Sequence, residues 1–148
     1  MVTFNVIVNF NNVNDLPDPM PNENLMRIPR KNFPSIDLIY SQYLVQITIA
    51  STHSFIINDE IAQLIVSLDL EVAWTILFIV PADILQEFKP QKVEKTKRPV
   101  YKTKNDNLNA RKSETKRLDK AEKLKEKALL LAKFFPQKVL GLECQSKR

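Results

Sequence analysis

The stretch SIDLIYSQYLVQITIA, residues 35–50, decides the fold of this 148-residue chain. It contains two runs, 35–40 and 43–50, that are rich in β-branched and aromatic residues, with Ser41 and Gln42 between them. Such residues favour strands, and two runs separated by two polar residues are typical of a β-hairpin. The stretch therefore predicts two antiparallel strands joined by a tight turn.

The predicted hairpin places polar side chains on one face. With a two-residue turn, residues whose numbers sum to 83 lie opposite one another, so Asp37 faces Gln46 and Thr48 lies two places along the same face. A loop with an odd number of residues would shift this register. A carboxylate and a side-chain carbonyl could supply two oxygen ligands of a magnesium ion. The alternative, which the residues alone favour, is a hydrogen-bonded polar patch on the solvent face of a sheet.

Outside the hairpin, hydrophobic periodicity and turn residues predict the other elements of a compact body. These are a strand over 2–10 with alternating apolar residues, an irregular connection over 11–32, a helix that begins after the N-cap Asn58 and buries a face ending at Leu68, a buried strand over 74–80, and a short helix opened by Pro81.

We therefore expect an α/β fold: a small mixed sheet with a central β-hairpin and flanking helices, followed by a basic linker and a C-terminal helix. The expected boundaries are 1–90 for the body, 91–112 for the linker and 113–148 for a basic amphipathic helix with its tail. Pro136 disfavours helical geometry at the preceding residue and should end that helix.

Charge divides the chain into two parts. Residues 1–88 carry a net charge of −7 and residues 89–148 carry +12, which together give the +5 of the whole chain. A basic arm on a folded body predicts binding to phosphate groups with little sequence preference. The charge pattern does not distinguish DNA from RNA, and DNA is the first expectation. The residues expected to bind nucleic acid are Lys95, Lys97, Arg98, Lys102, Lys104, Lys112, Lys116, Arg117 and Lys120. Two alternatives are a solvated helix with internal charge pairs and a helix whose apolar stripe binds a protein or ribonucleoprotein partner.

Composition excludes several classes of site. Gly141 is the only glycine, so a glycine-rich phosphate loop is excluded, and Cys144 is the only cysteine, so neither an internal disulfide nor a cysteine zinc site is expected. The longest apolar run is too short to span a bilayer, and no secretory signal is visible. An intracellular location is the expectation, and the segment 95–99 (KTKRP) is compatible with a nuclear import signal.

Two longer segments show a family resemblance. The runs IPRKNFPSIDLIYSQYLVQITIASTHSF and ILFIVPADILQEFKPQ, within residues 25–91, resemble the C-terminal part of the Crinkler and retrotransposon hot spot nuclease-like domains. Those domains belong to the PD-(D/E)XK restriction-endonuclease-like superfamily. The pieces that carry the resemblance are NFPSID at 32–37, Gln46-Ile47-Thr48 with His53, and Phe78-Ile79-Val80-Pro81 leading to Phe88 and Gln91.

The resemblance implies a catalytic role for the hairpin. Asp37 would bind Mg²⁺, Gln46 would occupy the acidic place of the catalytic triplet, and Thr48 would occupy its lysine place, for phosphodiester hydrolysis. Two departures weaken this role. Thr48 cannot supply the positive charge of a lysine, and the acidic residue that such domains carry on an earlier helix has no counterpart before the first strand. We therefore expect a nuclease-like protein, truncated or catalytically impaired, associated with nucleic acid.

His53 allows two interpretations. Its unperturbed pKa near neutrality suits a general base, whereas its position in a Ser-Thr-His-Ser stretch is more typical of a surface or turn residue, which is the interpretation we favour.

Overall fold

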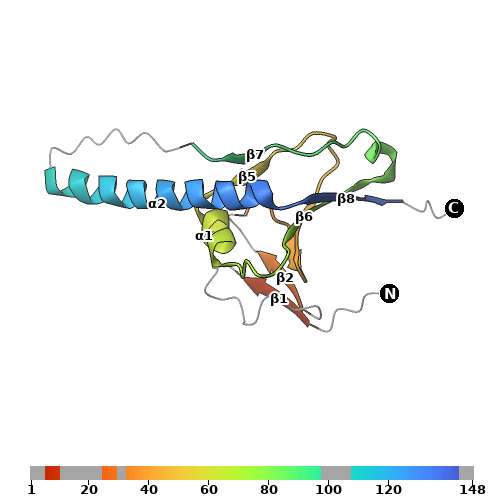
Figure 1. Cartoon of the computed structure of the whole chain (residues 1–148), viewed down its shortest axis with the longest axis horizontal. Helices are drawn as coiled ribbons and strands as arrows, with labels where there is room; N and C mark the ends of the chain where they lie inside the picture. Colours follow the sequence, from red (N-terminus) through yellow and green to blue (C-terminus); the bar gives the residue numbers. More distant parts are fainter. Residues whose placement is uncertain (1–5, 11–24, 30–32, 98–107, 144–148) are drawn as a thin grey trace.

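The computed structural model describes residues 6–10, 25–29, 33–97 and 108–143, and it shows the expected mixed α/β fold (Figure 1). Six strands form one sheet in the order β1-β2-β3-β4-β6-β8, and β5 and β7 form a parallel pair. The elements are β1 Val6–Phe10, β2 Leu25–Pro29, β3 Leu38–Tyr40, β4 Tyr43–Ile47, β5 Phe55–Ile57, α1 Asp59–Ser67, β6 Thr75–Pro81, the 3₁₀ helix η2 Ala82–Ile84, β7 Val93–Lys95, α2 Leu108–Phe134 and β8 Gln137–Leu142.

The central hairpin has the expected register. β3 and β4 are antiparallel, with Leu38 opposite Val45 and Tyr40 opposite Tyr43. Ser41 occupies the turn with a φ of 51°, in the left-handed region. The sequence prediction of the turn and of its register is confirmed over residues 38–45, but the ladder does not include the expected pairing of Asp37 with Gln46.

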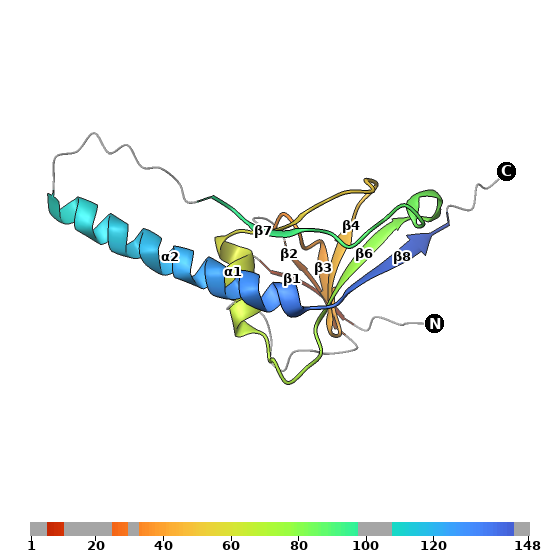
Figure 2. The same ribbon diagram turned by 45° about the horizontal axis from the view of Figure 1, so that its top comes forward.

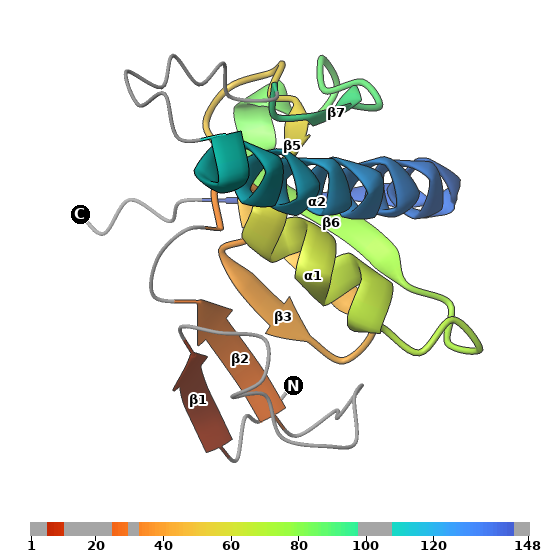
Figure 3. The same ribbon diagram turned by 90° about the vertical axis from the view of Figure 1, so that its left-hand side faces the viewer.

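The two helices lie on the same face of the sheet, as seen from the end of α2 in Figure 3. On that face Leu44 and Phe78 are fully buried, and they belong to one core cluster with Leu64 of α1 and Ala128 of α2. Gln46 pairs in register with Phe78 and therefore lies on the helix-covered face. The alternative of a polar patch on the solvent face is thus wrong for Gln46, because the helices cover that face.

Local signals at α1 and β6 act as the sequence predicts. Asn58 is the N-cap of α1, and its side-chain oxygen accepts a hydrogen bond from the Ile61 amide at 2.9 Å. Trp74 is buried just before β6, and its indole N–H donates to the Asp69 carbonyl at 2.9 Å. Directly after Pro81, the chain enters η2.

Four short strands are not among the predicted elements, and one of them is β5, which follows the hairpin. β2 lies within the region 11–32 that was interpreted as irregular, and β7 lies within the region 91–112 that was interpreted as a linker. β8 lies in the expected tail of 113–148, where it joins the sheet parallel to β6. The structure therefore corrects the picture of a body that ends at residue 90, because the C-terminal segment supplies one edge of its sheet.

Gly141 explains how β8 fits there. A β-carbon at this position would lie 3.0 Å from Cδ2 of Leu85 and 3.3 Å from Cα of Ala82, both tighter than ordinary contact. Glycine therefore allows η2 to pack directly on the backbone of β8.

Candidate functional site

Asp37 lies at the end of the hairpin ladder and is exposed. Its backbone amide donates to the Val45 carbonyl at 2.8 Å, so the strict register stops at Leu38. Its carboxylate Oδ2 accepts a hydrogen bond from the Ile47 amide at 2.6 Å. The carboxylate thus accepts the hydrogen bond that a backbone carbonyl would accept if the ladder continued.

Gln46 is only 3% exposed, and its side chain contacts His53, which the sequence predicts to be a surface or turn residue. The Gln46 side-chain amide nitrogen lies 2.8 Å from His53 Nδ1, and the same ring nitrogen lies 3.1 Å from the Ser54 carbonyl. A proton on Nδ1 suits the carbonyl of Ser54, and Gln46 would then turn its oxygen toward the ring. In either orientation one terminal atom of the Gln46 amide is buried without a partner among the described residues.

Two further glutamines, Gln91 and Gln137, connect His53 to β8 through hydrogen bonds. Gln91 accepts a hydrogen bond from the His53 backbone amide, and Gln137 of β8 forms two hydrogen bonds with the Gln91 backbone, at 2.6 and 2.8 Å. We call Gln46, His53, Gln91 and Gln137 the amide cluster. The cluster contains no carboxylate. Its contacts link β4, two loops and β8, so its role is structural. The sequence gave no periodic signal for it.

Asp37, Gln46 and Thr48, the three residues expected to be catalytic, each form a hydrogen bond with a different partner. Asp37 binds the Ile47 amide, Gln46 contacts His53, and Thr48 Oγ1 accepts a hydrogen bond from the Ala50 amide at 3.1 Å. Within the described part of the chain, no group of three or more Asp, Glu, His or Cys side chains is placed to hold a metal ion. These residues therefore do not fit a magnesium site built from several fixed anionic ligands.

Lys95, the first of the expected phosphate-binding residues, is engaged in ion pairs. It is the last residue of β7, opposite Ile57 of β5, and it donates to Glu122 of α2, with Glu126 at 3.3 Å. The hydrogen bond between the two side chains raises the pKa of Lys95 and lowers the pKa of Glu122. Lys95 thus attaches α2 to β7, which competes with phosphate binding.

Lys125 completes this attachment. It is only 4% exposed, and its ammonium group lies 3.3 Å from Glu122 and 3.8 Å from Asp59 in the first turn of α1. It also donates to the Thr96 carbonyl at 3.3 Å. Ion pairs between Lys95, Glu122, Lys125 and Asp59, which we call the anchor network, hold α2 against α1 and β7.

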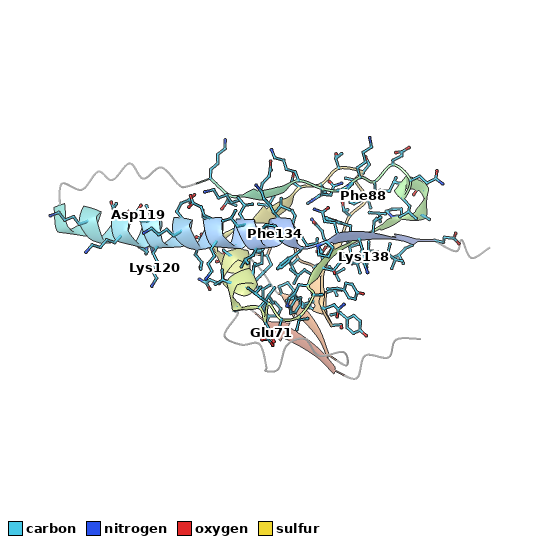
Figure 4. All side chains as sticks on the ribbon, in the orientation of Figure 1. Glu71, Phe88, Asp119, Lys120, Phe134 and Lys138 are labelled. Carbon is cyan, nitrogen blue, oxygen red and sulfur yellow. The ribbon has the colours of Figure 1, made fainter. Side chains whose placement is uncertain are left out.

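The N-terminal half of α2 extends beyond the body, as Figures 1 and 2 show. Lysines recur along α2 at spacings of three and four residues, which places them on one side of the helix. They are Lys112, Lys116, Lys120, Lys123 and Lys127, all exposed, and we call them the lysine stripe. Figure 4 shows the Lys120 side chain on the extending half, away from the sheet.

Two of the other residues expected to bind nucleic acid, Lys97 and Arg117, are described by the structure, and three are not. Lys97 is exposed just after β7, and Arg117 is exposed on α2 with an interaction partner of its own. Arg98, Lys102 and Lys104 lie outside the described residues. The structure thus places Lys112, Lys116 and Lys120 together on one surface and separates Lys95 from them.

Two apolar side chains continue the side of α2 that bears the lysine stripe. Leu130 is 62% exposed and Phe134 is 86% exposed, one turn apart near the end of the helix. Neither α2 nor any other helix in the described ranges is both long and apolar enough to cross a membrane.

Comparisons with protein-family models, with curated proteins and with solved structures give no match.

Proposed function

We propose that this protein is a nucleic-acid-associated, nuclease-like protein that binds the phosphate backbone through the lysine stripe and has weak or absent catalytic activity. The observation that carries the proposal is the stripe itself: five exposed lysines on one side of a helix that extends away from the body. DNA is the expected ligand, and sequence preference should be low because lysines contact phosphates without reading bases.

The length of the stripe suits a polyanion. Fifteen residues separate Lys112 from Lys127, which at the rise of an α-helix is about 22 Å. Duplex DNA carries one negative charge per about 1.7 Å of its axis, so several phosphates lie within reach of the five lysines. The anchor network supports this role, because it fixes the C-terminal half of α2 to the body and lets the other half extend.

The contacts of Asp37 and Gln46 support the second part of the proposal, impaired catalysis. Hydrolysis of a phosphodiester with metal ions needs fixed anionic ligands around the metal. Asp37 serves a backbone amide, and Gln46 is neutral and buried beneath the helices. We therefore expect little or no cleavage of duplex DNA in the presence of Mg²⁺.

Substitution of Lys112, Lys116 and Lys120 by alanine tests the proposal in the full chain. The triple variant should bind a duplex oligonucleotide at least about tenfold more weakly at low salt, because three counterion-releasing contacts are removed. Fluorescence anisotropy with two duplexes of equal length and unrelated sequence measures both affinity and sequence preference. The wild-type protein should bind both duplexes with similar affinity.

A second triple variant controls for overall charge. Lys89, Lys92 and Lys133 are exposed and lie outside the stripe, and their replacement by alanine changes the net charge by the same amount. This variant should bind nearly as well as the wild type. Equal losses in both triple variants, or no binding by the wild type, would refute a role for the lysine stripe.

Leu130 and Phe134 favour a second candidate function, a non-enzymatic interaction module that binds a protein or ribonucleoprotein through α2. Exposed large apolar side chains on one side of a helix are typical of helix-binding partners. Under this alternative, the double substitution Leu130→Ser/Phe134→Ser would abolish partner binding while leaving DNA affinity unchanged.

A further inference from the structure

Among the residues that the structure describes, β8 forms one edge of the six-stranded sheet and pairs only with β6. Strands at an edge present backbone amides and carbonyls that another strand can pair with. Natural edges are commonly protected by charged side chains, bulges or a covering segment. On β8, Lys138 is the only charged residue between Gln137 and Leu142, whereas Val139, Leu140 and Leu142 are all exposed.

The backbone of β8 offers its odd-numbered residues to a partner. The Ile76 amide donates to the Pro136 carbonyl, which sets the alternation of the parallel ladder. Even-numbered residues of β8 therefore face β6, and the amides and carbonyls of Val139 and Gly141 point away from it. A strand placed beside β8 would find two residues ready to pair.

A row of apolar side chains leads to this edge on the face opposite the helices. Ile47, Ile79 and Leu140 are side by side in the registers of β4, β6 and β8. Leu140 is 49% exposed at the end of the row. The next position of the same face pairs Pro81 with the exposed Leu142. The row ends at an open edge where a further apolar residue would continue it.

The charges near the two ends of β8 favour an antiparallel second copy over a parallel one. Lys138 stands near the start of β8 and Glu143 directly after its end, and both are exposed. A second β8 in antiparallel orientation places the Lys138 end of one strand beside the Glu143 end of the other, whereas a parallel copy would set Lys138 beside Lys138. We propose that the protein forms a two-fold dimer in which β8 of one copy pairs antiparallel with β8 of the other. This inference does not depend on nucleic-acid binding.

One antiparallel register uses the outward-facing backbone groups of β8 and continues the apolar row. With Leu140 on the two-fold axis, Val139 pairs with Gly141 of the second copy through the outward-facing backbone groups. The two Leu140 side chains then meet across the axis, and the carbon stem of Lys138 covers Leu142 of the other copy. The helices of both copies lie on the same side of the resulting continuous sheet. The contact is short, so we expect a weak dimer with a concentration-dependent population.

The substitution Leu140→Lys tests the dimer in the full chain. It places two like charges opposite each other on the axis, and the exposure of Leu140 makes the change tolerable within one copy. Sedimentation equilibrium should show monomer and dimer for the wild type and monomer alone for Leu140→Lys. The matched control Leu130→Lys, an exposed leucine on α2, should dimerise as the wild type does.

Cysteine crosslinking tests the register and does not rely on the lysine variant folding. In a Cys144→Ser background, Leu140→Cys should form a disulfide-linked dimer on mild oxidation, because residues opposite each other in a non-hydrogen-bonded pair lie within disulfide range. Leu130→Cys in the same background should remain unlinked. A wild-type chain that is monomeric up to roughly 1 mM, dimers that persist in Leu140→Lys, or equal crosslinking at both positions would overturn the proposal.

Discussion

At the scale of single residues, Asp37 shows how a correct register can lead to a different role. The hairpin pairing follows the sequence prediction as far as Leu38, and the Asp37 carboxylate lies close to β4. Its partner, however, is the Ile47 amide, whereas the Gln46 side chain lies under the helices. Sequence reasoning gave the pairing of the backbone, but the last residue of a ladder is free to use its side chain as an acceptor, and no periodic pattern reveals that choice.

Asp37 should therefore affect folding stability more than chemistry. Asp37→Ala removes the acceptor of the Ile47 amide and should lower the free energy of unfolding by about 1 kcal/mol, a modest value because the site is exposed. Asp37→Asn keeps a side-chain oxygen and should stay close to the wild type. Urea denaturation followed by circular dichroism measures both variants.

The same two Asp37 variants test whether the carboxylate has a catalytic role. Incubation with duplex DNA and Mg²⁺ should give no cleavage for the wild type or for either variant. Robust cleavage by the wild type that disappears in both Asp37→Ala and Asp37→Asn would show that the carboxylate acts as a metal ligand, and impaired catalysis would have to be abandoned.

At the scale of elements, long periodic segments and the strands of the hairpin were predictable, whereas the other short strands were not. Asn58 and the apolar spacing after it locate α1, and the apolar run ending at Val80 locates β6. α2 begins at Leu108 rather than near Ser113, and it ends before Pro136 as expected. Three- to six-residue strands such as β7 and β8 carry too few residues for a period to be visible, and their existence depends on the neighbours that they pair with.

The anchor network is an element-scale feature that the sequence did not indicate. Lys95 and Glu122 are 27 residues apart, and their contact depends on the β5–β7 pair and on the α1–α2 packing. Lysines in a basic segment look alike in sequence, yet Lys125 is buried and Lys123 is exposed. Only the packing of α2 tells structural lysines from those available to a ligand.

The anchor network predicts a pH dependence of stability. The pKa of Glu122 is lowered from its ordinary value of 4.5, mainly by the hydrogen bond from Lys95. The stabilisation is therefore complete above pH 4.5 and is lost as the pH falls through the lowered pKa of the folded state. Glu122→Gln should reduce the free energy of unfolding by about 1 to 2 kcal/mol at neutral pH, and this difference should shrink in acid.

Chemical denaturation over a pH series measures that difference. Glu143→Gln, an exposed carboxylate outside the anchor network, serves as the control and should change the unfolding free energy by less than about 0.5 kcal/mol at neutral pH. A Glu122→Gln variant that is as stable as the wild type at neutral pH would show that the ion pairs contribute nothing to the docking of α2.

At the scale of the whole molecule, the charge division of the sequence takes a spatial form. The acidic part, residues 1–88, forms most of the body, and the lysine stripe lies on a helix that extends from it. The sequence predicted the charge division, while the attachment of the helix to the body comes from the anchor network and from β8. The stripe is thus held at a defined place on the molecule, as a binding arm needs.

The most direct test of this account is the salt dependence of duplex DNA binding by the wild type and by the variant with alanine at 112, 116 and 120. Each phosphate contact contributes about 0.9 to the slope of log K against log salt concentration. We predict a steep negative slope for the wild type and a slope shallower by about 2 to 3 for the variant. Equal slopes for the two proteins, or wild-type binding that does not respond to salt, would contradict the account.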